Sequence, residues 1–167
     1  MMRKREKKME GTGYIKIETE IRRGDGTVKE HLVEEGLSGT YATYVNDGLE
    51  YTVKLLNGIS TDPFIYMSNG TGSTAESNAQ TALVSENTGG GMDRKEATCS
   101  YEADYKAKWI ATWTASGGTE IVREIGIHDD PTAGNMLMRH VYAANKTLAD
   151  TESITVTAIF TQARTAL

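Results

Sequence analysis

The chain has 167 residues but only one cysteine, two prolines and two phenylalanines, and these shortages exclude several classes of protein. With Cys99 alone, neither an intrachain disulfide nor a cysteine-rich metal site can form. No apolar run approaches the roughly 18 residues that a membrane span needs, and the N-terminus lacks the apolar core of a signal peptide. We therefore expect one soluble domain with no membrane partner and no cofactor.

Basic residues are outnumbered, 18 Lys and Arg against 23 Asp and Glu, which gives a formal charge of -5 and argues against nucleic acid as a partner. The first ten residues nevertheless carry a local excess of positive charge. This segment is either a solvated terminus or an arm that docks on an acidic neighbouring subunit or on phosphate charge. Its candidate partner-binding residues are Arg3, Lys4, Arg5, Lys7 and Lys8.

Glycine and threonine are abundant, with 17 and 22 residues, which is typical of many turns and half-exposed strands. We predict a mainly β (α+β) fold, an antiparallel β-sandwich with one or two helices from the N-terminal half packed at its edge. The predicted organisation is a basic arm over residues 1–12, a single sandwich domain over 13–163 and a tail over 164–167.

The N-terminal half predicts a hairpin and then a helix. Residues 14–33 alternate with period two around the turn residues 24–26. Residues 40–57 carry apolar side chains at helical spacing, with Gly58 placed as a C-cap glycine. We expect this apolar stripe to lie in the core; it consists of Tyr41, Val45, Leu49, Val53 and Leu56.

The rest of the chain predicts strands, apart from one helix-like piece over residues 76–86. The pattern places a short strand at 63–67 and turns at 116–118, 129–134 and 145–150. The longer strands are predicted at 94–103, 105–115, 120–128, 136–142 and 153–161. In the strand 105–115, Trp109 and Trp113 fall on one face with the alanines.

Three local motifs suggest chemistry, and each also has a structural explanation. The segment 70–75 matches a dinucleotide fingerprint, but no βαβ unit follows it. His128, Asp129 and Asp130 offer cation ligands, although an acidic turn before proline is ordinary hairpin chemistry. Cys99 is expected to be buried, and cross-strand ion pairs are expected among Glu120, Arg123, Glu124 and Arg139.

The two tryptophans leave two interpretations open. Trp109 and Trp113 lie four residues apart on one strand face. They could form a sugar-stacking platform for a glycan, although core packing accounts for them better.

A series of motifs recurs in a fixed order over roughly residues 14–163: Gly70-Thr71-Gly72, Ala82-Leu83, Glu86, Arg123-Glu124-Ile125-Gly126 and Met136-Leu137-Met138-Arg139. In this order the motifs resemble those of a widespread group of structural proteins of tailed bacterial and archaeal viruses. The group includes tail-fibre-like, head-fibre and capsid-decoration components. The sequence departs from the group at His128, where Phe is more common, and in its basic arm.

The resemblance implies a non-enzymatic virion protein that is assembled in the host cytoplasm and located at the particle surface. The implied role is a capsid decoration, cement or head-fibre component. Its implied partners are further copies of itself, as a trimer or dimer, and the major capsid protein or another virion protein. The alternatives are a tail-fibre or baseplate-associated protein, and a glycan-binding host-recognition module.

Overall fold

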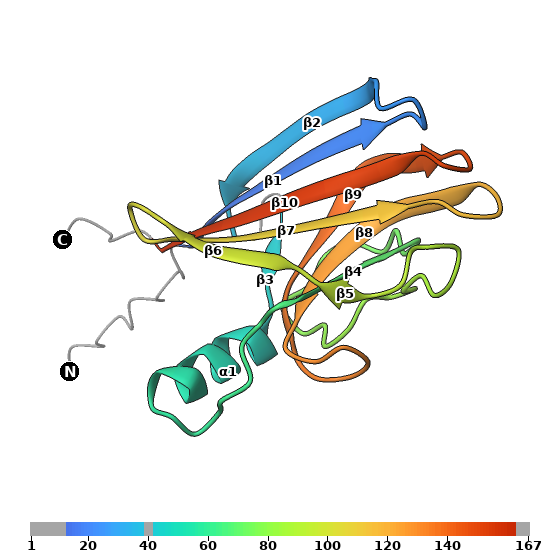
Figure 1. Ribbon diagram of the computed structural model, residues 1–167. Coiled ribbons are helices and arrows are strands. Elements are labelled where there is room, and N and C mark those ends of the chain that lie inside the picture. The colour runs from blue at the N-terminus through green and yellow to red at the C-terminus, as the bar shows by residue number, and fades with distance from the viewer. Residues whose placement is uncertain (1–12, 39–41, 163–167) are drawn as a thin grey trace, which may run out of the picture.

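A computed structural model describes residues 13–38 and 42–162, which form two antiparallel five-stranded sheets and one helix in a mainly β, sandwich-like arrangement (Figure 1). The first sheet has the strand order β2-β1-β10-β7-β6 and the second has the order β3-β9-β8-β4-β5. The elements are β1 (Gly13–Arg22), β2 (Val28–Leu37), β3 (Thr43–Tyr44), α1 (Asn46–Leu56), β4 (Tyr66–Gly70), β5 (Lys95–Glu96), β6 (Thr98–Glu102), β7 (Lys106–Thr114), β8 (Glu120–His128), β9 (Met136–Leu148) and β10 (Ser153–Gln162).

The first sheet follows the period-two pattern closely. In β1, Ile15, Ile17 and Ile21 are buried, whereas the lysine and glutamates between them are half-buried. The predicted hairpin is confirmed, with Gly26 at a φ of 83° and the Asp25 carboxylate accepting a hydrogen bond from the Thr27 N–H. A side chain at Gly26 would be strained, which is why this tight turn needs glycine.

The second sheet is buried on both of its faces along most of β8. Its inner face packs on the first sheet through Ile125 and Ile127, which belong to the main core. Its outer face is covered by the connection over residues 71–86, and Leu83 packs there with Val45 and Met136 in a second, smaller cluster. An irregularity in the pairing of β8 and β9 at residues 122–124 switches which residues face inward, so that Val122 also reaches the core.

Polar contacts join the two sheets along the side formed by β2 and β9. The Tyr142 hydroxyl lies 2.7 Å from that of Thr19, and burial raises the pKa of Tyr142. His140 Nε2 lies 3.0 Å from a Glu34 carboxylate oxygen, and this contact lowers the pKa of Glu34. Lys146 also pairs with a glutamate of β2. This side of the molecule is therefore held together by hydrogen bonds and charge.

The helix begins later than predicted, at Asn46, because residues 43–44 pair with β9 as a strand. Its C-terminus is as predicted: Gly58 has a φ of 74°, and the N–H groups of Gly58 and Ile59 donate to the carbonyls of Leu55 and Lys54. This is the Schellman arrangement that glycine favours.

The expected burial of the apolar stripe is confirmed for Val45, which is 0% exposed, but it is wrong for the three stripe residues that lie on the helix. Leu49, Val53 and Leu56 are 53%, 59% and 83% exposed, and Tyr41 lies outside the described residues. The helix instead packs through Gly48, whose position leaves no room for a Cβ beside the Leu137 carbonyl of β9. Glycine allows the two backbones to approach closely, and this turns Leu49, Val53 and Leu56 away from the core.

Other predicted elements also need correction. No helix forms at residues 76–86, because this connection is held by side chains of the second sheet. The strand predicted at 63–67 lies at 66–70, and the one at 94–103 divides into β5 and β6. The strand predicted to end at residue 142 continues to Leu148, through most of the predicted turn.

We predict that Gly48→Ala destabilises the protein by about 1–3 kcal/mol, although alanine ordinarily favours a helix interior. The added Cβ would lie 2.4 Å from the Leu137 carbonyl oxygen. Urea denaturation monitored by circular dichroism measures the effect. Glu50→Ala on the exposed side of the same helix is the control and should change the free energy of unfolding by about 0.5 kcal/mol or less. An equal effect of both substitutions would contradict this account of helix packing.

Candidate functional site

A fully buried ion pair between Glu124 of β8 and Arg139 of β9 lies on the outer face of the second sheet. Arg139 Nε donates to a Glu124 carboxylate oxygen over 2.7 Å, and both side chains have 0% exposure. The same carboxylate accepts hydrogen bonds from the N–H groups of Gly72, Val84 and Ser85. The expectation of cross-strand ion pairs among Glu120, Arg123, Glu124 and Arg139 is thus confirmed for one pair.

The Glu124 and Arg139 pair determines the path of residues 71–86. Arg139 Nη1 donates to the Thr74 carbonyl and to the side chain of Gln80, which holds the middle of the connection. A Cβ at Gly72 would lie 2.4 Å from a Glu124 oxygen, and one at Gly70 would lie 2.3 Å from the Ser85 carbonyl. The glycines of this motif therefore allow close approach to a carboxylate, and no helix N-terminus follows them to hold a phosphate.

Two other motif residues, Glu86 and Arg123, have partners outside the buried pair. Arg94 donates two hydrogen bonds to the Glu86 carboxylate and two more to the carbonyls of Asp130 and Ala133. Arg123 instead contacts Asn145 over 3.4 Å, so it does not join the buried pair. Sequence reasoning missed Arg94, which connects the β4 side of the sheet to the turn between β8 and β9.

Ser68 and His128 form a second buried pair that sequence reasoning also missed. Ser68 Oγ lies 2.7 Å from His128 Nε2, which is the separation of a nucleophile and its base. Both residues are at most 1% exposed, so no substrate can reach them. Burial lowers the pKa of His128 to about 3, which keeps the imidazole neutral.

The acidic turn after His128 uses its carboxylates internally. Asp129 accepts hydrogen bonds from the backbone and side chain of Asn135, and Asp130 accepts them from the N–H groups of Thr132 and Ala133. The His128 ring is directed at Ser68 and away from these carboxylates. Within residues 13–38 and 42–162, no group of three or more His, Cys, Asp or Glu side chains could hold a metal ion.

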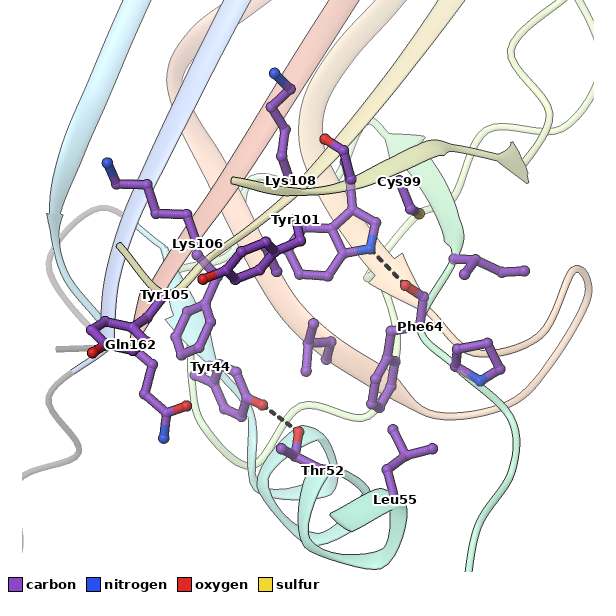
Figure 2. A pocket seen from close by; sticks show the side chains of 17 residues that line it. Tyr44, Thr52, Leu55, Phe64, Cys99, Tyr101, Tyr105, Lys106, Lys108 and Gln162 are labelled. Carbon is purple, nitrogen blue, oxygen red and sulfur yellow. Dashed lines mark hydrogen bonds between the residues drawn. The ribbon is translucent and has the colours of Figure 1, made fainter. Parts of the chain in front are cut away.

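An open hollow of about 560 Å³ lies between the inner face of the first sheet and helix α1 (Figure 2). Aromatic rings dominate its lining: Tyr44, Phe64, Tyr101, Tyr105, Trp109 and Phe160. Thr52 and Leu55 reach it from the helix, whereas Lys106 and Lys108 extend away from it. Cys99, expected to be buried, is exposed in this lining because β6 lies beyond the cover of the second sheet. Burial raises the pKa of its thiol, so it lacks the lowered pKa of an activated nucleophile.

The two tryptophans do not form a stacking platform. Trp113 is fully buried and its Nε1 donates to the Asp93 carbonyl over 2.9 Å. Trp109 is 7% exposed and its Nε1 donates to the Phe64 carbonyl over 2.6 Å. Both indoles anchor neighbouring segments to the first sheet, so the platform interpretation is wrong and the core interpretation holds.

Exposed apolar side chains are concentrated at this end of the molecule. Of the ten large exposed ones among the described residues, six lie on α1, just after it, or at the hollow: Leu49, Val53, Leu56, Ile59, Tyr101 and Tyr105. Isolated exposed apolar residues are normal on a protein surface, whereas a cluster marks a site of association. We call Leu49, Val53, Leu56 and Ile59 the apolar ridge.

The basic residues proposed to bind a partner, Arg3, Lys4, Arg5, Lys7 and Lys8, lie outside the described residues. No helix in the described part of the chain is long and apolar enough to cross a membrane. Comparison with known protein families finds no family model that matches the chain, and comparison with curated proteins finds no matching relative.

We predict that Glu124→Ala destabilises the fold by about 3–5 kcal/mol, because it leaves the buried Arg139 charge unpaired. Three backbone N–H groups of the 71–86 connection lose their acceptor as well. The measurement is the free energy of unfolding in urea. Arg22→Ala, which breaks the exposed pair with Glu20, is the control and should cost about 1 kcal/mol or less. Equal losses would contradict a special role for the buried pair.

His128 predicts a pH dependence of stability. Its pKa is about 3 in the folded protein and about 6.5 when unfolded, so below pH 6.5 the unfolded chain binds more protons. Stability should therefore fall with decreasing pH, with a contribution from His128 approaching about 1.4 kcal/mol per pH unit well below 6.5.

Urea titrations between pH 7 and 4.5 test this prediction. The double variant Ser68→Ala/His128→Phe removes the imidazole and its partner together, and should lose that share of the slope. Ser68→Ala alone keeps the imidazole and should keep the slope. An unchanged slope in the double variant would show that other groups cause the pH dependence.

Proposed function

We propose that this chain is a non-enzymatic structural protein of a tailed-virus particle, a capsid decoration, cement or head-fibre component that binds the particle surface as an oligomer. The proposed architecture is an antiparallel β-sandwich, formed by the two sheets, with α1 packed at its edge. The proposal places the protein in the virion, after assembly in the host cytoplasm, with the major capsid protein or another virion protein as its partner.

The observation that carries the proposal is the apolar ridge beside the open aromatic hollow. Leu56, at the end of α1, and Ile59, just after it, are 83% and 73% exposed, and only one face of this helix packs on the sheets. Leaving such side chains in water forgoes burial worth about 1.5–3 kcal/mol each. A protein that works by surface association gains that free energy when a partner covers them.

The placement of the resembling motifs also supports a structural role. Gly70, Gly72 and Leu83 pack over the second sheet, and Glu124 and Arg139 hold that packing in place. The buried imidazole of His128 contacts Ser68 on the neighbouring strand β4, and that of His140 contacts Glu34 of β2 in the other sheet. These groups support the architecture, so function falls to the exposed surfaces.

The arm is the proposed tether to an acidic particle surface, because its charge is opposite to that of the rest of the chain. We predict that replacing Arg3, Lys4, Arg5, Lys7 and Lys8 together with glutamine reduces co-sedimentation with virus particles lacking the protein by about tenfold at low salt.

Deletion of residues 1–10 should give the same loss, and the wild-type protein should lose binding as salt is raised. The matched control replaces Lys16, Lys29 and Lys95, which lie on the folded body, with glutamine. Undiminished binding of the arm variants would contradict the tether.

A further inference from the structure

We propose that the apolar ridge of one copy packs into the aromatic hollow of a second copy, and reciprocally, in a two-fold dimer. This inference rests on the proposed function and names the surface through which the oligomer forms. It is carried by the position of the ridge next to the hollow, by their shapes and by the charges around them.

The ridge and the hollow are adjacent on the same helix. Successive residues of an α-helix are rotated by about 100°, so Leu56 lies only about 40° around the axis from Thr52. Thr52 and Leu55 line the hollow, whereas Leu49, Val53 and Leu56 form the next strip of the helix surface. The apolar surface therefore continues from a concave lining onto a convex helix face.

This arrangement is self-complementary. When two copies face each other about a two-fold axis, each convex ridge meets the other copy's concave hollow, and the same patch is buried twice. Tyr101 and Tyr105, which are 74% and 63% exposed, are the rings that an incoming Leu56 or Ile59 side chain would cover. Burying exposed aromatic side chains against aliphatic ones is typical of the centre of an interface.

The charges around this end favour a second copy over a strongly charged partner. Each basic group near it has an acidic neighbour on the same chain: Lys54 with Glu50, Lys108 with Glu102, and Lys106 with Asp104. Two copies with a net charge of -5 repel each other at long range, whereas the three ion pairs at this face add no net charge to it. The lysines of this face are therefore already paired within one copy, which disfavours a strongly acidic partner there.

Gly13, where β1 begins, lies beside two residues that line the hollow. Gly13 begins β1 opposite Gln162, and a Cβ there would lie 2.5 Å from the Phe160 ring. Gln162 and Phe160 both line the hollow. Residues 1–12 are therefore attached at the rim of the proposed interface, and their occupation of their own hollow is the competing outcome to test.

The first experiment measures association by sedimentation velocity over a range of concentrations with the full chain. We expect a monomer and dimer equilibrium that Leu56→Glu weakens at least about tenfold, because the substitution buries a charge in an apolar contact. Val28→Glu is the matched control, since Val28 is also exposed and apolar but lies on β2, and it should leave the affinity unchanged. Circular dichroism checks that each variant is folded.

A mixing experiment distinguishes ridge-into-hollow packing from ridge-against-ridge packing. Tyr101→Glu alters the hollow, so it should weaken self-association as Leu56→Glu does. A mixture of the two variants should associate more tightly than either alone, because the mixed dimer keeps one contact between an intact ridge and an intact hollow. No recovery on mixing would overturn the reciprocal geometry.

The single thiol provides an independent readout. Cys99 lines the hollow and is exposed, so its rate of reaction with a maleimide reports whether the hollow is covered. We expect the rate to fall several-fold as the wild-type concentration rises, and to stay constant for Leu56→Glu. Protection that is independent of concentration and is lost on deleting residues 1–10 would assign the hollow to the chain's own arm and overturn the proposal.

Further outcomes separate this proposal from the virion role. A wild-type protein that stays monomeric, forms a trimer or dimerises with an affinity that Leu56→Glu does not change would overturn the two-fold interface. Particle binding by such a protein would leave the virion role in place. A dimer that depends on Leu56 but does not bind particles would support the interface and contradict the virion role.

Discussion

The covering of the second sheet's outer face depends on one carboxylate that water does not reach, that of Glu124. Glu124 lies on β8 with no exposure to water, and its charge is compensated by the Arg139 guanidinium and three backbone N–H groups. A buried charge is tolerated only when it is paired and hydrogen-bonded in this way. The requirement fixes residues 71–86 against the sheet, and they in turn cover the second face of β8.

The contacts between the two sheets differ from one side of the molecule to the other, and the hollow lies on the side with fewer of them. On the side of β2 and β9, polar pairs such as Tyr142 with Thr19 and His140 with Glu34 hold the sheets together. Toward β6 the second sheet provides no cover, and helix α1 faces the first sheet across the hollow. Trp109 bridges this gap at one point, through its hydrogen bond to the Phe64 carbonyl.

The pairs of polar side chains in the interior support the fold, and the exposed groups are the ones available to a partner. The Ser68 and His128 pair has the separation expected of a catalytic pair but is buried, and the exposed Cys99 has a raised pKa. Among the described residues, the apolar ridge and the aromatic hollow are accessible, and the sequence adds a basic terminal segment whose charge is opposite to that of the body. In the proposed function these three features bind other proteins, and the proposed two-fold contact would cover the ridge and the hollow.

The sequence by itself determined the β-rich class, the hairpin, the boundaries of β8 and the inward faces of β1 and β10, because a period of two follows directly from strand geometry. It also determined the C-terminal glycine of the helix and placed Glu124 and Arg139 among four residues expected to form cross-strand ion pairs, but the tertiary structure decided which of them pair. Only the tertiary structure decided that residues 76–86 are not helical, because long-range hydrogen bonds to Glu124 and Arg139 replace those of a helix. It also decided that Leu49, Val53 and Leu56 face water: a helical period shows that a stripe exists, but the close approach of Gly48 to Leu137 decides which face is buried.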